Sequence, residues 1–150
     1  MKRLQTLGLL LEREQGRRDE AQEAVRAAAR NEAAAREQLE GLVNYRSEYC
    51  ARWSAQFAKP STIEILRCYQ AFIGRLDQAI GQQQGAVRSA QAGVEGARKR
   101  LVEREIRVAT VERLIARHRA LLARVQDRRD QKNLDELSQR RSPAAELVGL

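Results

Sequence analysis

Apolar residues recur along most of this 150-residue chain in alternating steps of three and four. A first series occupies positions 4 to 53, where eleven of fifteen positions are apolar, and a second occupies positions 66 to 129, where fifteen of nineteen are apolar. Such a repeat places a narrow apolar seam along one side of a helix, as in coiled coils. Because neither series slips, the sequence predicts two long helices that supercoil around each other.

A turn signal separates the two series. Pro60 lacks the amide proton that a helix interior needs, and Ser61 and Glu64 have the S-x-x-E spacing of a helix-starting capping box. We therefore expect the chain to turn back near residues 58–61. Because a connection this short favours antiparallel neighbours, a residue of the first helix should lie beside one whose number is about 120 minus its own.

The predicted fold is all-α: an antiparallel coiled-coil hairpin over residues 1–141, with the second helix overhanging the first. Leu4 should meet residues near 114 to 118, so the part of the second helix from Arg119 onward has no neighbour in the chain. Ser142-Pro143 is expected to end this helix, which leaves residues 142–150 as a disordered tail.

The composition argues against an enzyme. Hydrophobic residues make up 43% of the chain but aromatic residues only 4%, so a large core around a substrate cleft is not expected. The sequence has no phosphate-binding glycine loop, no metal-ligand spacing and no nucleophile elbow, and its single histidine, His118, falls on the seam. Cys50 and Cys68 are read as reduced thiols. We expect no catalytic residue, metal or cofactor, and a cytoplasmic protein without a membrane span.

All six aromatic residues lie between positions 45 and 72, on either side of the turn. With heptad labels that start at position 4 in the first helix and 66 in the second, Gln38, Tyr45, Phe72 and Ala79 share the g row, and the two g rows face each other in an antiparallel pair. An exposed strip is predicted, and such strips on a thin rod mark partner sites. The strip comprises Gln38, Leu42, Tyr45, Tyr49, Phe72, Leu76 and Ala79.

The net charge of +8 is also unevenly placed. Between Arg98 and Arg129 there are eleven basic residues and four acidic ones. Leucines surround the start of the first helix and recur near position 121 of the second, offering more apolar surface than one seam can bury. These features predict an acidic protein partner at this end, and a solvated basic helix face is the simpler alternative.

The sequence resembles the FliJ family, the coiled-coil component of the bacterial flagellar type III export apparatus. The resemblance covers nearly the whole chain, and its most specific strings are L-x-x-Y-R-x-E-Y over residues 42–49 and F-x-x-x-L-D-x-A-I over residues 72–80. A third matching stretch covers residues 129–136. The family's members are similar to the central stalk of rotary ATPases.

The resemblance implies a non-enzymatic stalk that supports flagellum assembly. Its terminal helix ends would insert into the hexameric export ATPase FliI and stimulate ATP hydrolysis, and the strip would bind the membrane export gate FlhA. Contact with the ATPase regulator FliH and with export chaperones is also implied, as is indirect association with the cytoplasmic face of the inner membrane. The residues assigned to the ATPase ring are Leu4, Leu7, Leu11, Arg117, Leu121, Leu122, Arg124 and Arg128.

Three alternatives stay open from sequence. The first is an analogous stalk of a virulence type III secretion system. The second is a basic coiled coil that binds nucleic acid or anionic membranes, although no aromatic residues are interleaved with the basic ones and no nucleic acid is expected as a partner. The third is a self-associating structural coiled coil.

Overall fold

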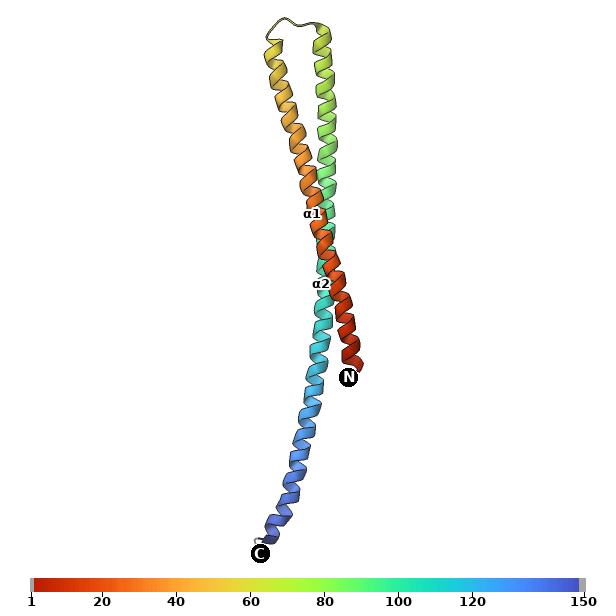
Figure 1. Cartoon of the computed structure of the whole chain (residues 1–150), viewed down its shortest axis with the longest axis vertical. Helices are drawn as coiled ribbons and strands as arrows, with labels where there is room; N and C mark the ends of the chain where they lie inside the picture. The colour runs from red at the N-terminus through yellow and green to blue at the C-terminus, as the bar shows by residue number, and fades with distance from the viewer. Residues whose placement is uncertain (1, 149–150) are drawn as a thin grey trace. The chain divides into compact units, whose positions relative to one another are not determined.

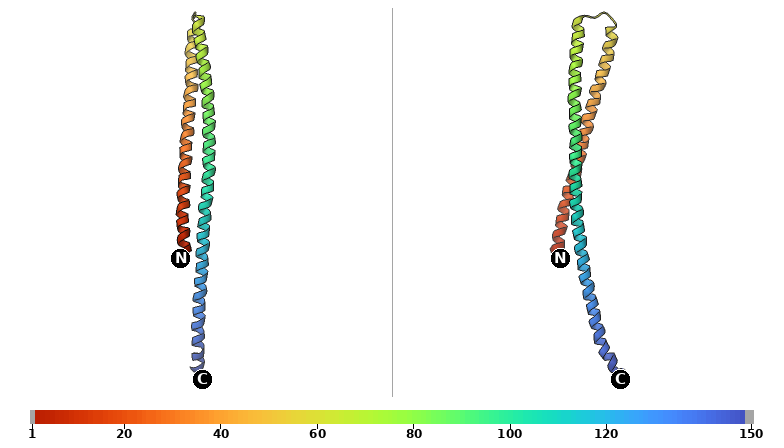
Figure 2. Two further views of the ribbon diagram at one scale, coloured as in Figure 1. Left: turned by 90° about the vertical axis from the view of Figure 1, so that its right-hand side faces the viewer. Right: turned by 180° about the vertical axis from the view of Figure 1, so that it is seen from behind.

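The computed structural model describes residues 2–148, with side chains to residue 141, and consists of two helices. Helix α1 spans Lys2–Phe57 (56 residues) and helix α2 spans Ile63–Val148 (86 residues) (Figure 1). Residues 58–62 connect them. The predicted all-α helical hairpin with a longer second helix is confirmed. Figure 2 gives two further views of α1 and α2.

Burial along both helices follows the predicted seam. All fifteen seam positions of α1, from Leu4 to Trp53, are buried or half-buried, and so are all fifteen seam positions of α2 from Tyr69 to His118. The most buried apolar side chains are those of Val94, Ala97 and Val108, at 4%, 2% and 4% exposed. The three-four repeat therefore identifies the contact face correctly over the length where both helices are present.

The connection starts α2 one residue later than the sequence suggested. The Thr62 hydroxyl oxygen accepts a hydrogen bond from the amide of Ile65 (3.4 Å), and the Leu66 amide donates to the Thr62 carbonyl (3.3 Å). Thr62 is thus the N-cap, with its side chain satisfying an amide that has no partner within the helix. The expected capping box from Ser61 to Glu64 is wrong by one position, because two hydroxyl residues stand side by side and the second takes the role.

Two compact units divide the chain. The turn unit is Arg17–Arg104 and contains the connection with the parts of α1 and α2 that flank it. The terminal unit is Met1–Gly16 with Glu105–Leu150, in which the start of α1 packs beside α2 and α2 then continues alone. Each unit carries one of the predicted interaction surfaces.

The end of α2 differs from the sequence prediction. The helix continues past Ser142-Pro143 to Val148, although a proline removes one backbone hydrogen bond. Residue 139, whose carbonyl the proline leaves without a donor, is exposed to water, so the helix can tolerate this loss. The predicted disordered tail, 142–150, lies outside the residues whose side chains are described.

Candidate protein-interaction sites

The aromatic side chains of the turn unit form one continuous cluster. Tyr49 is its centre: its ring centroid lies 4.6 Å from that of Phe72, 5.7 Å from Tyr69, 6.1 Å from Trp53 and 6.2 Å from Tyr45. The i to i+4 spacing of Tyr45, Tyr49 and Trp53 stacks them along one side of α1. The prediction that residues from the two g rows meet is confirmed, since Tyr45 and Phe72 are in edge contact at 6.3 Å.

The predicted strip is less exposed than the sequence suggested. Leu76 is only 8% exposed, because its d position turns it into the seam. Leu42, Tyr49, Phe72 and Ala79 are half-buried. The residues that solvent reaches best are Gln38 and Tyr45, the latter at 46%. Leu76 is therefore a core residue beneath the strip, and a partner would meet Tyr45 with the edges of its neighbours.

Polar contacts across the seam fix how the two helices align at the strip. The Arg46 guanidinium donates hydrogen bonds to both carboxylate oxygens of Asp77. This hydrogen bonding is the larger cause of the raised pKa of Arg46, and the negative charge of Asp77 is the second. The Gln83 amide donates to the Ala35 carbonyl (2.9 Å) and to the Gln38 side-chain oxygen (3.2 Å). Because both contacts join particular residues of α1 and α2, a shift of the helices by one turn would break both.

A thiol and a phenol also interact inside the aromatic cluster. A side-chain hydrogen bond with Cys50 raises the pKa of Tyr69, and desolvation by burial acts in the same direction. Cys50 is half-buried and Cys68 is exposed, and both are free thiols. Cys50 thus lies close enough to Tyr69 to affect the pKa of its phenol, which the sequence did not suggest.

The terminal unit carries the leucine-rich surface. Leu4, Leu7 and Leu11 are half-buried against α2, whereas Leu121 and Leu122 are 52% and 42% exposed. Three arginines assigned to the same surface are exposed, namely Arg117, Arg124 and Arg128. The structure places Leu7 of α1 in one groove with Arg117 and Leu121, and leaves Arg124 and Arg128 further along α2.

Two exposed leucines further along α2 escaped the sequence analysis. Leu134 is 66% exposed and Leu137 is 55% exposed, and together with Ser138 and Arg141 they line a shallow hollow. They were missed because they lie outside the heptad series, which stops at Arg129. Their i, i+3 spacing is the signal that could have identified them as a separate apolar face.

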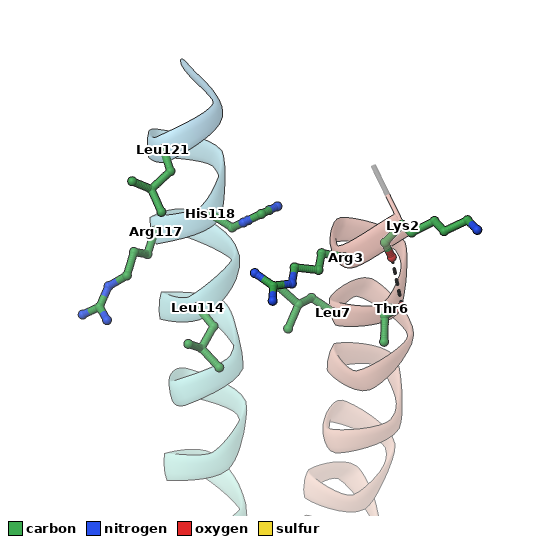
Figure 3. A pocket seen from close by; sticks show the side chains of 8 residues that line it. All are labelled: Lys2, Arg3, Thr6, Leu7, Leu114, Arg117, His118 and Leu121. Atoms are coloured by element: carbon green, nitrogen blue, oxygen red, sulfur yellow. Dashed lines mark hydrogen bonds between the residues drawn. The ribbon is translucent and has the colours of Figure 1, made fainter. Parts of the chain in front are cut away.

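Grooves run along both flanks of the seam in the terminal unit. The larger, about 430 Å³, is lined by Lys2, Arg3, Thr6, Leu7, Leu114, Arg117, His118 and Leu121 (Figure 3). The other, about 340 Å³, is lined by Leu4, Gly8, Leu11, Glu112, Ile115, Ala116 and Arg119. We call them the basic groove and the mixed groove, after the charges of their lining residues.

The described residues contain no group of three or more His, Cys, Asp or Glu side chains placed to hold a metal ion. Among the same residues, neither helix has a stretch apolar enough to cross a bilayer. His118 lies half-buried at its seam position, as expected, and lines the basic groove. The recognisable surface features are therefore the aromatic strip, the exposed leucines and the two grooves.

Comparison with known families agrees with this architecture. The family model described as the flagellar FliJ protein matches residues 1–146 of the chain, which include α1, the connection, all but the last two residues of α2 and both candidate surfaces. No curated protein and no solved structure matches the chain. The resemblance seen in the sequence is thus confirmed over almost the whole length, and the chain belongs to the FliJ family of flagellar export components.

Proposed function

We propose that the protein is a non-enzymatic stalk of the flagellar type III export apparatus with a different partner at each unit. The terminal unit binds the hexameric export ATPase and stimulates ATP hydrolysis, and the aromatic strip of the turn unit binds the membrane export gate. The family match supports the flagellar system over the virulence one. The protein would then act at the cytoplasmic face of the inner membrane, with the ATPase regulator and export chaperones as further partners.

The observation that carries this proposal is that each unit has an exposed surface and that the two surfaces differ in chemistry. In the turn unit, Tyr45 is 46% exposed and is the most exposed ring of the strip, whereas in the terminal unit the exposed Leu121 and Leu122 lie near exposed arginines in the sequence of α2. Aromatic anchors are typical of protein interfaces, and arginines favour acidic partners. A single partner would need one surface that accepts aromatic side chains and another that is acidic, so two different partners are the simpler explanation.

The gate contact is tested by pull-down of the gate's cytoplasmic part with Tyr45→Ala and with Tyr45→Ala/Phe72→Ala. Truncating an aromatic anchor should weaken binding by about tenfold or more. Val43→Ala is a matched control, because Val43 is 45% exposed but lies on the other flank of the seam. Unchanged binding by the double variant would remove the assignment of the strip.

The ATPase contact is tested by reversing the charges of Arg117, Arg124 and Arg128 together. The triple glutamate variant should lose most of the stimulation of ATP hydrolysis, since like charges would then face the partner. Its control reverses Arg67, Arg75 and Arg88, which are equally exposed but belong to the turn unit. Full stimulation by the first variant, or equal loss by both, would contradict the assignment.

A further inference from the structure

The basic groove combines an apolar floor with a cationic rim. Leu114 and Leu121 are 43% and 52% exposed and lie on α2, opposite the half-buried Leu7 of α1. In Figure 3, Leu7 and Arg3 project from α1 toward α2, and His118 projects from α2 toward α1. At about 430 Å³, the groove has room for one or two large apolar side chains rather than a whole domain.

The charges around this groove are of one sign. Lys2, Arg3 and Arg117 line it together with His118, whereas none of its lining residues is acidic. The mixed groove on the other flank differs, because its lining includes the acidic Glu112 as well as the basic Arg119. An occupant of the basic groove must therefore supply its own negative charge, and the same occupant gains much less in the mixed groove.

This asymmetry also disfavours a second copy of the chain as the occupant. Residues 107–129, the part of α2 that surrounds the groove, carry seven arginines against Glu112 and Asp127. Bringing two such segments together places like charges side by side, which costs free energy. An acidic segment of another protein meets no such penalty.

We propose that the basic groove binds an acidic amphipathic helix of a partner protein. The helix inserts a leucine-type side chain between Leu7, Leu114 and Leu121 and places carboxylates, one turn before and after it, against Arg3 and Arg117. This is the helix-in-groove mode of recognition, in which apolar anchors supply affinity and flanking charges supply specificity. The inference rests on the proposed function only in assigning the terminal unit to a protein partner.

The probe is a labelled synthetic peptide of about 18 residues, helical and acidic, with leucines on one face and glutamates beside them. Fluorescence anisotropy with the full chain should show saturable binding that weakens as salt is raised. A peptide with glutamine for each glutamate, and one with serine for each leucine, should each bind at least about tenfold more weakly. Equal binding by the glutamine peptide would overturn the charge requirement, and equal binding by the serine peptide would overturn the groove.

Variants of the chain locate the site. Arg117→Glu and, separately, Leu121→Ser should each weaken peptide binding by about tenfold, and Arg3→Glu/Arg117→Glu should weaken it further. All these side chains are exposed enough to be changed without disturbing the seam. Arg119→Glu is the matched control, since it makes the same charge change two residues from Arg117 but in the mixed groove. Equal losses by Arg117→Glu and Arg119→Glu would overturn the proposal.

Other occupants are outcomes of the same experiments. A dimer in sedimentation that Leu121→Ser abolishes would replace the acidic helix with a second copy. Displacement of the peptide by phosphatidylglycerol vesicles, but not by phosphatidylcholine vesicles, would point to a lipid surface and likewise overturn the proposal. The experiments also distinguish this proposal from the proposed function. If the peptide does not bind but the chain still stimulates ATP hydrolysis, only the groove proposal is rejected. If the unmodified chain does not stimulate ATP hydrolysis, the assignment of the ATPase as partner is rejected.

Discussion

The turn unit and the terminal unit are built from the same two helices and the same apolar repeat, yet they use the repeat differently. In the turn unit the seam is covered by the chain itself, and Val87, Ala90, Val94 and Ala97 are at most 9% exposed. In the terminal unit burial ends at His118, although the repeat continues along α2. The repeat therefore shows where a helix can pair, and the length of its neighbour decides whether it does so within the chain.

The polar side chains of the two units also differ in whether they contact each other within the chain. In the turn unit charged and amide groups meet across the seam, as between Arg46 and Asp77 and between Gln83 and Gln38. Around the basic groove the terminal unit instead gathers charges of one sign. Groups that satisfy one another hold the helices in register, and groups that do not are available to a partner.

The largest expected effect on the free energy of unfolding comes from comparing a leucine buried in the seam with one exposed on α2. Leu76→Ala in the turn unit removes a side chain that is 8% exposed, so it should lower the free energy of unfolding by about 2 kcal/mol or more. Leu134→Ala makes the same change at a site that is 66% exposed and should stay within about 0.5 kcal/mol. Urea unfolding followed by far-ultraviolet circular dichroism measures both. Similar losses of stability for the two variants would mean that Leu134 is buried in solution, and would contradict the difference in burial between the two units.

Most of the fold was predictable because the three-four spacing of apolar residues in a heptad repeat identifies the face by which two helices contact each other. The approximate antiparallel alignment, to within about a helical turn, was also predictable from the position of the turn near Pro60: Gln83 reaches Ala35 and Gln38, and Tyr49 stacks on Tyr69. A short connection between two uninterrupted repeats permits few other alignments. This is why one proline defines contacts about 35 Å away along the helices, at roughly 1.5 Å per residue.

The features that escaped prediction depend on single side chains rather than on the repeat. The S-x-x-E spacing predicted Ser61 as the helix cap, whereas the neighbouring Thr62 takes this role, since its hydroxyl can accept from a free amide equally well. It also counted Leu76 into an exposed strip, although burial at a d position depends on how closely the neighbouring rings pack over it. The sequence predicted a partner surface that includes Leu7, Arg117 and Leu121 but not the groove itself, because its lining comes from the first turns of α1 and from a distant part of α2 and shares no motif.

A moderate effect is expected from the glycines of α2. A Cβ atom at Gly81 or Gly93 would meet no other side chain within 4 Å, so Gly81→Ala should raise the free energy of unfolding by about 0.5 to 1 kcal/mol, and Gly93→Ala should add to it. Gly8→Ala in the terminal unit also meets nothing within 4 Å, but a smaller gain is expected because the first turns of a helix fray. The measurement is again urea unfolding. A larger gain at Gly8 than at Gly81 would show that the terminal unit limits stability.

The smallest expected effect is a shift in the titration of one phenol, which reports on the turn unit alone because all three tyrosines lie there. The Cys50 hydrogen bond raises the pKa of Tyr69, so its stabilising contribution is complete below the ordinary value of about 10 and is lost as the pH rises through the folded-state pKa. In a Tyr45→Phe/Tyr49→Phe background, absorbance near 295 nm follows Tyr69 by itself. Cys50→Ala should lower this pKa, and Cys68→Ala, which changes an exposed thiol, should leave it unchanged. Identical curves for the two cysteine variants would contradict the hydrogen bond, and would leave this part of the seam held by the packing of the aromatic rings and by the contact between Arg46 and Asp77.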